Sequence, residues 1–400
     1  MRRLISTCLL AANFALWPCR PLVGEPVDLT VYHEFNGDRT NGLETQGALL
    51  HATDGALYGT TIRGGAHGQG TLFKLVPETK AFRLIHDFSH SPTDGREPTG
   101  PLSEGKDGFL YGTTSLGGSL GVGTIYKVKK DGTSFSLISS FTGVGGDGRG
   151  PFSGLRQGKD LGWIGTTDEG GMFGSGTIYV IKPGGSRHLV VHHFGGKLRK
   201  DGGKPHGPLC LASDGKWYGA TVAGGWDDHG IIFVIHGDGS GYRMLRAFSG
   251  APNDAARPYG GLIEGTDGLL YGTTISGGTA LQGTLFRCRK DGGGFELLRV
   301  FTGLGAEGSN PYAELVEGKD GSFYGVTLNG GPHAGGLLFR FTGKGSNYET
   351  LFAFSDKGEE GRGPYGGLTL FPDGSLFGTT SSGAGLRGGV VFRLQPRTGL

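Results

Sequence analysis

Long apolar runs and an excess of charge are both missing from this sequence. After residue 24, no segment is apolar enough to span a bilayer. Without the three arginines of the first 20 residues, 35 bases stand against 36 acids, a net charge of −1. A nearly neutral chain without a basic tract is poorly suited to nucleic acid or to anionic membranes. We therefore expect no nucleic-acid partner and no membrane insertion.

Recognisable catalytic and metal-binding motifs are missing too. The chain contains no nucleophile elbow, phosphate-binding loop, HExxH sequence or paired-cysteine motif. Of its four cysteines, only Cys210 and Cys288 lie beyond residue 24. They occupy unrelated positions of the repeats described below, so we interpret them as buried free thiols. We expect no cofactor and no metal.

The first 24 residues predict a signal peptide. Arg2-Arg3 gives a positive start, residues 4–17 are apolar, and Leu22-Val23-Gly24 is an imperfect cleavage signal. Cys19 raises the alternative of a lipoprotein, but the preceding Trp17-Pro18 does not fit a lipid-attachment sequence. We expect a bacterial protein that is secreted or periplasmic.

Glycine is abundant, at 84 of 400 residues. Aromatic residues make up 10% of the chain, which argues against disorder, and no Gly-X-Y period indicates collagen. No ten-residue stretch has a helical period. The composition therefore favours many short strands joined by glycine turns.

An internal repeat predicts the fold. A phrase that reads Asp-Gly-Phe-Leu-Tyr-Gly-Thr-Thr at residues 107–114 recurs seven times, in steps of 53 residues except for one step of 54. Columns of Leu, Gly and Thr keep the same spacing. The leading aspartates of the seven copies are Asp54, Asp107, Asp160, Asp214, Asp267, Asp320 and Asp373.

Each repeat contains four strand-like runs. In the second copy they are residues 100–106, 109–115, 123–128 and 135–141, and residues 116–122 form a glycine-rich loop. Asp-Gly between the first two runs is typical of a tight hairpin, because glycine tolerates the positive φ that such turns require. Four short strands per repeat are typical of a propeller blade.

The two ends of the chain fit into one ring. Residues 27–35 form an orphan fourth strand, and the last repeat stops after a third strand at residues 389–394. Pairing these two segments would complete a blade and remove both exposed sheet edges. We predict an all-β fold, a seven-bladed β-propeller of four-stranded blades closed by its N-terminal strand. It is one domain over residues 27–394, followed by a short tail at 395–400, and we expect a monomer.

The repeated phrase resembles a known family. Asp-Gly-x-Leu-Tyr-Gly-Thr-Thr-x-x-Gly-Gly, followed by Gly-Thr-Ile/Leu-Phe/Tyr-Lys, is similar to the GloVer repeat of bacterial exported proteins, and the resemblance covers residues 27–394. It implies export and a propeller-like repeat, but no activity and no catalytic residues. Members are described as choice-of-anchor proteins because their C-terminal sorting signals differ. This chain ends at residues 397–400 without such a signal, so we expect a protein that is not attached to the surface. A weaker likeness, to the regulator-of-chromosome-condensation repeat, lacks that family's Trp-Gly signature.

The loops from each fourth strand to the next first strand hold candidate site residues. One column of these loops is acidic, and most of its members precede glycine, which is typical of a turn. A ring of carboxylates for cations is the alternative. The members are Asp94, Asp147, Asp201, Asp254, Glu307 and Glu360.

A second column follows the loop proline and lies near the predicted channel mouth. Aromatic faces stack on sugar rings or on partner side chains, so we predict ligand contacts here, with packing between blades as the alternative. The column reads Gln46, Thr99, Phe152, His206, Tyr259, Tyr312 and Tyr365. Arginines of the same loops would bind carboxylates or phosphates, or else lie in solvent. They are Arg96, Arg149, Arg257 and Arg362.

One sector departs from the repeat. The third copy carries Asp168-Glu169 in its second-to-third loop, the fourth copy carries Trp226-Asp227-Asp228-His229 in the same loop, and the one extra residue of the array falls nearby. Carboxylates and an imidazole on one rim could serve acid–base chemistry or hold a metal, which makes Asp168, Asp227 and His229 candidates. Repeat drift on an exposed loop is the alternative.

Together these features favour an exported, non-catalytic binding protein. A glycan or another extracellular polymer is the expected ligand, or else a protein partner. A propeller hydrolase or lyase acting on polysaccharide is the alternative. Enzymes on this fold usually need lids or insertions that exclude water, whereas the loops here are nearly equal in length.

Overall fold

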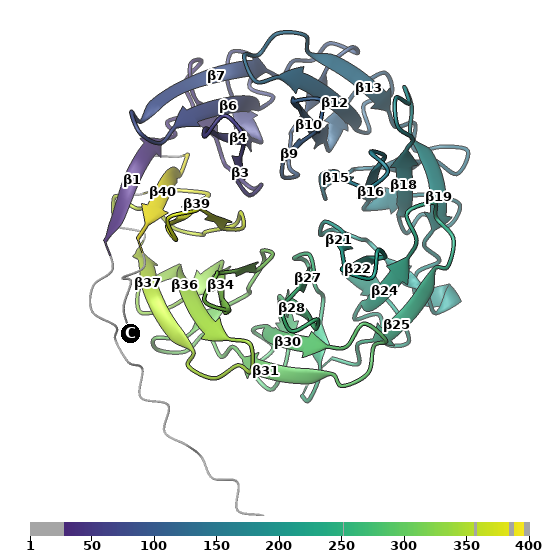
Figure 1. The fold of residues 1–400 in the computed structure, drawn as a ribbon, viewed down its shortest axis with the longest axis vertical. Helices are drawn as coiled ribbons and strands as arrows, with labels where there is room; N and C mark the ends of the chain where they lie inside the picture. The colour runs from purple at the N-terminus through teal and green to yellow at the C-terminus, as the bar shows by residue number, and fades with distance from the viewer. Residues whose placement is uncertain (1–27, 251, 356–357, 384–387, 396–400) are drawn as a thin grey trace, which may run out of the picture.

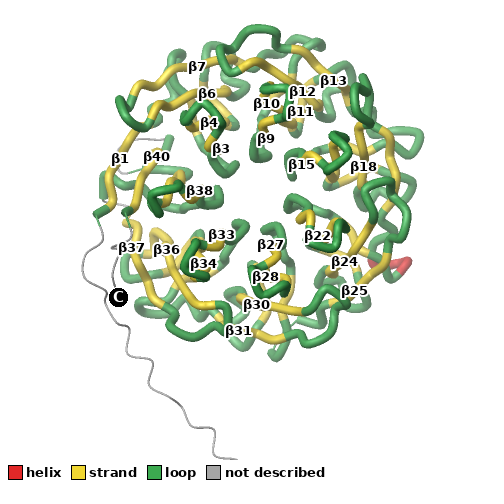
Figure 2. The backbone as a smooth tube through the Cα atoms, in the orientation of Figure 1, coloured by secondary structure: helices red, strands yellow, loops and turns green. Residues whose placement is uncertain are grey.

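Seven four-stranded sheets stand around a central channel (Figure 1). The structure, a computed structural model, describes residues 28–250, 252–355, 358–383 and 388–395, so the predicted signal peptide lies outside the described residues. The helical content of the described chain is a single 3-10 turn, η1 (Lys197–Arg199), at the rim of the ring (Figure 2). No described helix is long and apolar enough to cross a membrane. The predicted seven-bladed, all-β propeller is confirmed.

Each blade runs from a short inner strand at the channel to a long outer strand at the rim (Figure 1). Blades 1 to 3 contain β3 (Leu50–His51), β4 (Leu57–Thr61), β6 (Thr71–Val76) and β7 (Ala81–Asp87); β9 (Ser103–Glu104), β10 (Phe109–Thr114), β12 (Thr124–Lys129) and β13 (Ser136–Ser140); and β15 (Arg156–Gln157), β16 (Trp163–Thr167), β18 (Thr177–Ile181) and β19 (Leu189–His193). Blades 4 and 5 contain β21 (Cys210–Leu211), β22 (Trp217–Thr221), β24 (Ile231–Ile235) and β25 (Arg243–Ala247); and β27 (Ile263–Glu264), β28 (Leu270–Thr274), β30 (Thr284–Cys288) and β31 (Glu296–Val300). Blades 6 and 7 contain β33 (Val316–Glu317), β34 (Ser322–Thr327), β36 (Ala334–Thr342) and β37 (Glu349–Ser355); and β38 (Thr369–Leu370), β39 (Leu376–Thr379), β40 (Val390–Leu394) and β1 (Leu29–Glu34).

Blade 7 combines the two ends of the chain. Its outermost strand, β1, pairs antiparallel with β40, so that Leu29 lies opposite Leu394 and Glu34 opposite Val390. Just beyond β1, the Phe35 N–H donates to the Gly389 carbonyl at 2.9 Å. Figure 1 shows β1, in purple, beside β40, in yellow.

The repeated glycine of each second strand makes room for an aromatic ring. Gly59 lies opposite Phe73, and a Cβ on Gly59 would come within 2.4 Å of the Phe73 ring. The same arrangement recurs at Gly272, where a Cβ would lie 2.6 Å from the ring of Phe286. These rings are buried, and they pack with the phenylalanine that follows each outer strand, such as Phe88, in the core.

The connecting loops on one side of the ring are more ordered than the sequence predicts. This side, which we call the loop face, carries the fourth-to-first and second-to-third loops; the opposite hairpin face carries the turns between first and second and between third and fourth strands. In six blades the two loops pair as two-residue strands. The pairs are β2 (Gly42–Leu43) with β5 (Arg63–Gly64), β8 (Gly95–Arg96) with β11 (Leu116–Gly117), β14 (Gly148–Arg149) with β17 (Glu169–Gly170), β20 (Gly202–Gly203) with β23 (Ala223–Gly224), β26 (Ala255–Ala256) with β29 (Ser276–Gly277), and β32 (Gly308–Ser309) with β35 (Asn329–Gly330).

Two sequence predictions are thereby corrected. Residues 116–122 are not a plain loop, because β11 begins them. The first strand, predicted over residues 100–106, is paired only at Ser103–Glu104. Its missing half lies where neighbouring blades meet at the axis: a Cβ on Gly100 would come within 2.4 Å of the Gly154 nitrogen of the next blade. The chain there packs against its neighbour instead of extending its own sheet.

Candidate functional site

Each fourth-to-first loop turns into the channel at a proline. In blade 5, Arg257 has a φ of 58°, Pro258 is buried, and Tyr259 follows at the channel mouth. The proline ring packs on Gly230 of the preceding blade, where φ is +93° and an added Cβ would lie 3.0 Å from Pro258 Cδ. Glycine is needed at that position both for its conformation and for the close approach. This packing fixes the direction in which the following side chain leaves the loop.

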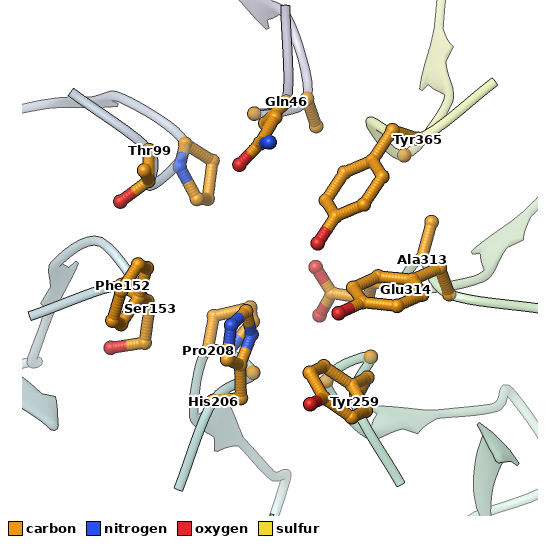
Figure 3. Close-up of a pocket in the computed structure, with 18 residues that line it drawn as sticks. Gln46, Thr99, Phe152, Ser153, His206, Pro208, Tyr259, Ala313, Glu314 and Tyr365 are labelled. Atoms are coloured by element: carbon orange, nitrogen blue, oxygen red, sulfur yellow. The ribbon is translucent and has the colours of Figure 1, made fainter. Parts of the chain in front are cut away.

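The residues after these prolines line one cavity at the channel mouth (Figure 3). It holds about 80 Å³ and receives side chains from all seven repeats. Its walls include Gln46, Thr99, Phe152, Ser153, His206, Tyr259, Tyr312, Glu314 and Tyr365.

The five predicted aromatic site residues form a continuous arc. Ring centroids lie 5.1 Å apart between Phe152 and His206, and 4.7 Å apart between His206 and Tyr259. The arc continues at 4.5 Å from Tyr259 to Tyr312 and at 4.3 Å from Tyr312 to Tyr365. All five side chains are half-buried, so each ring contacts its neighbours and still borders the cavity. The structure brings these residues together; their contact with a ligand stays a prediction.

The arc is uncharged at neutral pH. Burial, together with the nearby Lys204 charge, lowers the pKa of His206 to about 4. Burial also raises the pKa of Tyr365 to about 12, and burial with the neighbouring Tyr365 and Tyr259 raises the pKa of Tyr312. His206, Tyr312 and Tyr365 therefore offer polar groups and ring faces without a charge.

An ion pair crosses the channel beside this arc. Arg156 of blade 3 donates from Nη2 to Glu314 Oε2 of blade 6 at 2.8 Å. Burial raises the pKa of Glu314, and the Arg156 charge opposes that effect. The two side chains are 34% and 25% exposed, because the channel still reaches them. Figure 3 shows the Glu314 carboxylate directed into the cavity.

Sequence reasoning missed both members of this pair. The sequence does mark each of the two residues, because each is the one charged member of its column in the repeat. The positions that match Arg156 are Leu50, Ser103, Cys210, Ile263, Val316 and Thr369. Those that match Glu314 are Ala48, Pro101, Gly154, Pro208, Gly261 and Gly367.

The four predicted arginines lie outside the cavity wall. Arg149 forms an exposed ion pair with Glu169 at 2.7 Å, and Arg362 donates to the Ser382 hydroxyl at 3.3 Å. Arg257 is exposed and Arg96 is half-buried. The geometry therefore places them on the rim, and a ligand role for them stays a prediction.

The acidic column stabilises its own loops. Asp94 accepts hydrogen bonds from the backbone N–H groups of Ser89 and Gly95, at 3.0 and 2.8 Å, and from the His86 ring at 3.1 Å. Asp254 repeats this pattern, with Arg246 in the place of the histidine, at 2.9 Å. These bonds use the carboxylate oxygens locally, which supports the turn interpretation over a cation-binding ring.

The irregular sector does not form one cluster. Burial, partly offset by Lys204, raises the pKa of Asp168 to about 6, whereas Asp227 is exposed and His229 is half-buried. Among the described residues, no hydrogen bond or ion pair joins Asp168 to either of the other two. No group of three or more His, Cys, Asp and Glu side chains in the described ranges is placed to hold a metal ion. Cys210 and Cys288 are free thiols, Cys288 buried and Cys210 half-buried.

The repeat identifies the family. A family model described as the Gloeobacter/Verrucomicrobia repeat matches residues 44–264 and 206–400, nearly the whole chain. The chain belongs to this family. No curated protein matches the sequence.

Solved structures with the same fold share little sequence with this member of the Gloeobacter/Verrucomicrobia repeat family. An oligogalacturonate lyase from Vibrio parahaemolyticus has a TM-score of 0.58 at 11% identity, over 94% of this chain and 99% of the lyase. The extracellular domain of a putative hybrid two component system from B. thetaiotaomicron has a TM-score of 0.57 at 10% identity, over 90% of this chain and 40% of that one. A chain of a mitotic checkpoint complex has a TM-score of 0.60 at 11% identity, over 98% and 100%. At these identities the likeness shows the fold alone.

Proposed function

We propose that this protein is an exported, non-catalytic binding protein whose channel mouth takes the end of a glycan chain. The observation that carries the proposal is the arc of five contacting aromatic side chains around one cavity. Half-buried rings held by their neighbours lose little conformational freedom when a sugar stacks on them. Gln46 and the tyrosine hydroxyls offer hydrogen-bonding groups at the same wall.

The geometry favours binding of a chain end over threading of a chain. The cavity holds about 80 Å³, and the Arg156–Glu314 ion pair spans the channel beside it. A polymer passing along the axis would have to separate two partly buried charges, which is costly. A terminal sugar residue needs only the mouth.

A glycan-array screen of the purified full-length protein tests the proposal. The variant Tyr259→Ala/Tyr312→Ala/Tyr365→Ala should weaken binding of any glycan hit by about a hundredfold or more, if each stacking contact is worth about 1–3 kcal/mol. Its melting temperature should change little. Trp226→Ala is the matched control, because Trp226 is an exposed aromatic residue on the loop face that does not line the cavity.

Three outcomes would contradict the proposal. A collapsed melting curve in the triple variant would show that the rings serve packing between blades, where truncation costs about 3–5 kcal/mol each. Release of sugar products in a parallel lyase and hydrolase panel would make the protein an enzyme. An intact Met1 on protein recovered from the cytosol, measured by mass spectrometry, would refute export; we expect a mature N-terminus between residues 19 and 27.

A further inference from the structure

One blade lacks a side chain that the other six have. Four positions after the leading aspartate of the repeat, blade 3 carries Ile164, whereas the other blades carry an aromatic residue. These are Tyr58, Tyr111, Tyr218, Tyr271, Tyr324 and Phe377.

In two blades the hydroxyl of this tyrosine lies between its own blade and the next. The Tyr271 hydroxyl is 2.8 Å from Asp267 Oδ2 of its own blade and 2.7 Å from the Gly343 carbonyl of blade 6, so its one proton has an acceptor on either side. Its ring lies 4.3 Å from that of Phe323. The Tyr58 hydroxyl repeats this arrangement, 2.8 Å from Asp54 Oδ2 and 3.4 Å from a carbonyl of blade 2. The phenol thus has a ring partner, a carboxylate and a carbonyl.

At the junction of blades 3 and 4 these partners remain while the phenol is missing. Asp160 keeps the usual orientation, since its Oδ1 accepts the Gly162 N–H at 3.2 Å, just as Asp107 accepts the N–H two residues on at 3.2 Å. Its Oδ2 has no hydrogen-bond partner among the described residues. Gly237 is the counterpart of Gly343, and Trp217 is the counterpart of Phe323.

The space that the ring would fill is open. A Cβ on Gly265 or on Gly318 would meet the Cε2 atom of the blade's own tyrosine, at 2.8 and 3.1 Å. At Gly158, the equivalent position of blade 3, such a Cβ would meet no ring atom within 3.8 Å.

Two neighbouring columns change in the same blade. Val180 occupies the position of Arg287 in blade 5 and Arg340 in blade 6. Leu189 occupies the position of the glutamates that pair with these two arginines. In those blades the two positions form ion pairs of 2.7 and 2.8 Å, Arg287 with Glu296 and Arg340 with Glu349. In blade 3 both positions are apolar, and Leu189 is 37% exposed.

A cavity of about 610 Å³ lies between blades 3 and 4, against about 440 Å³ at the junction of blades 2 and 3, where Tyr111 is present. Ile164, Val180 and Leu189 line it, Trp217 borders it, and Asp160 and Gly237 stand at its polar side. This volume is within the range of small-molecule sites, which are mostly apolar with a few placed polar groups. The cavity opens on the hairpin face, away from the channel mouth.

We propose that this cavity binds a small phenol that carries an apolar substituent. The aromatic ring lies against Trp217, the hydroxyl donates to the Asp160 carboxylate, and the substituent runs along Val180 and Leu189. The ligand takes the place of the tyrosine that the other blades supply themselves. The proposal is independent of glycan binding at the channel mouth.

Tryptophan fluorescence tests the proposal with p-cresol, which has the structure of a tyrosine side chain. In a Trp226→Phe background, Trp163 and Trp217 are the tryptophans left beyond the predicted signal peptide, and both border the cavity. We expect a saturable fluorescence change with p-cresol. The methyl ether 4-methylanisole cannot donate a hydrogen bond to a charged acceptor, so it should bind at least about tenfold more weakly.

Three variants locate the site. Ile164→Tyr restores the tyrosine of five other blades, so its ring should occupy the place proposed for the phenol, abolish the p-cresol response and raise the melting temperature. Asp160→Ala is an exposed change that should weaken p-cresol at least about tenfold and leave 4-methylanisole unaffected. Val144→Tyr is the control, because it adds a tyrosine at an exposed residue outside the cavity, and it should bind p-cresol as the parent does. An unchanged response in Ile164→Tyr would overturn the site. Equal binding of p-cresol and 4-methylanisole, with no effect of Asp160→Ala, would overturn the proposal that the ligand is a phenol. If Ile164→Tyr does not fold, Asp160→Ala still tests the proposal.

Discussion

Arg156 and Glu314 come from blades on opposite sides of the channel, and their side chains meet at 2.8 Å. Both charges are partly withdrawn from water, with side chains 34% and 25% exposed, so each depends on the other. Removing one member leaves the other unpaired, whereas replacing both with uncharged residues removes the problem. The stability lost when one member is removed therefore reports how well water hydrates the channel.

Glu314→Gln should lower the free energy of unfolding by about 1–3 kcal/mol, less than the 3–5 kcal/mol of fully buried pairs because both side chains are partly exposed. Arg156→Met/Glu314→Gln should recover much of that loss. Chemical denaturation measures both. Asp291→Asn is the control: Asp291 pairs with Arg289 at 3.3 Å, both side chains are more than half exposed, and the change should leave the free energy of unfolding nearly unchanged. A loss as small in Glu314→Gln as in this control would show that water fills the channel.

A second prediction at the residue scale concerns His206 and the pH dependence of stability. Its folded pKa of about 4 lies below the ordinary 6.5. Between those values the unfolded chain binds a proton that the folded chain does not, so stability should fall as the pH drops from 6.5 towards 4. His206→Gln removes this contribution and should flatten the decline in that window. Denaturant midpoints measured at half-unit pH steps would show it, and parallel curves for parent and variant would refute a neutral, buried His206.

Repeat spacing could predict the aromatic arc but not the ion pair. The prolines and the shared column place Tyr259, Tyr312 and Tyr365 on one rim, because every blade repeats the same turn. Arg156 and Glu314 are 158 residues apart, and their contact depends on how the ring closes. A comparison of one blade with the next shows that each is unusual, but not that they meet.

At the scale of elements, β1 is the strand whose loss is most informative. It is the outer edge of blade 7 and pairs with β40 along Leu29–Glu34. Deleting residues 27–35 should leave the β40 edge exposed and blade 7 with three strands, so we expect aggregation or a clearly lower melting temperature. Deleting residues 1–24 alone is the control and should change neither. A shortened chain that stays monomeric with an unchanged melting curve would show that ring closure does not depend on β1.

The longer strands were predictable and the two-residue strands were not. The second, third and fourth strands of each blade alternate or bury a recognisable run, and in six blades an Asp-Gly turn precedes the second strand. Pairs such as β8 with β11 are too short to have a period, and they form between loops that meet only once the blade is folded. The shortened first strand escaped prediction for a related reason: contact with the neighbouring blade at the axis decides its length.

Across the whole molecule, the outer strands are linked by a repeated contact between blades. The His86 ring lies between Asp94 of its own loop, at 3.1 Å, and the Phe135 ring of the next blade, with ring centroids 3.7 Å apart. Arg246 repeats the contact with the Phe295 ring, 3.7 Å from its centroid. Each such side chain joins an acidic loop residue to the following blade, so the carboxylates of the acidic column contribute to ring stability.

This arrangement predicts cooperative unfolding in acid. Burial alone would raise the pKa values of Asp94, Asp147 and Asp201, but hydrogen bonds from His86, His188 and Tyr242, and from loop N–H and hydroxyl groups, outweigh it and hold all three below the usual range. A carboxyl whose folded pKa lies below its unfolded value stabilises the fold above the unfolded pKa, about 3.9, and this contribution is lost as the pH falls through the folded value. The parent protein should therefore lose stability steeply below about pH 4.

Asp94→Asn tests whether the carboxylates cause this loss. The amide removes one charge-assisted partner of His86, so the variant should be less stable than the parent at pH 7, by about 1–2 kcal/mol. It should also lose less on acidification, so that the two stability curves converge near pH 3. Asp131→Asn is the control, because the pKa of Asp131 is lowered by hydrogen bonds with Thr133 within its own exposed turn, and among the described residues its carboxylate accepts none from another blade. An Asp94→Asn stability curve that stays parallel to the parent's through pH 3 would show that acid acts elsewhere.

Because each of these contacts spans a blade boundary, the whole ring should unfold in one transition. Two separated transitions would show that the blades unfold independently of one another.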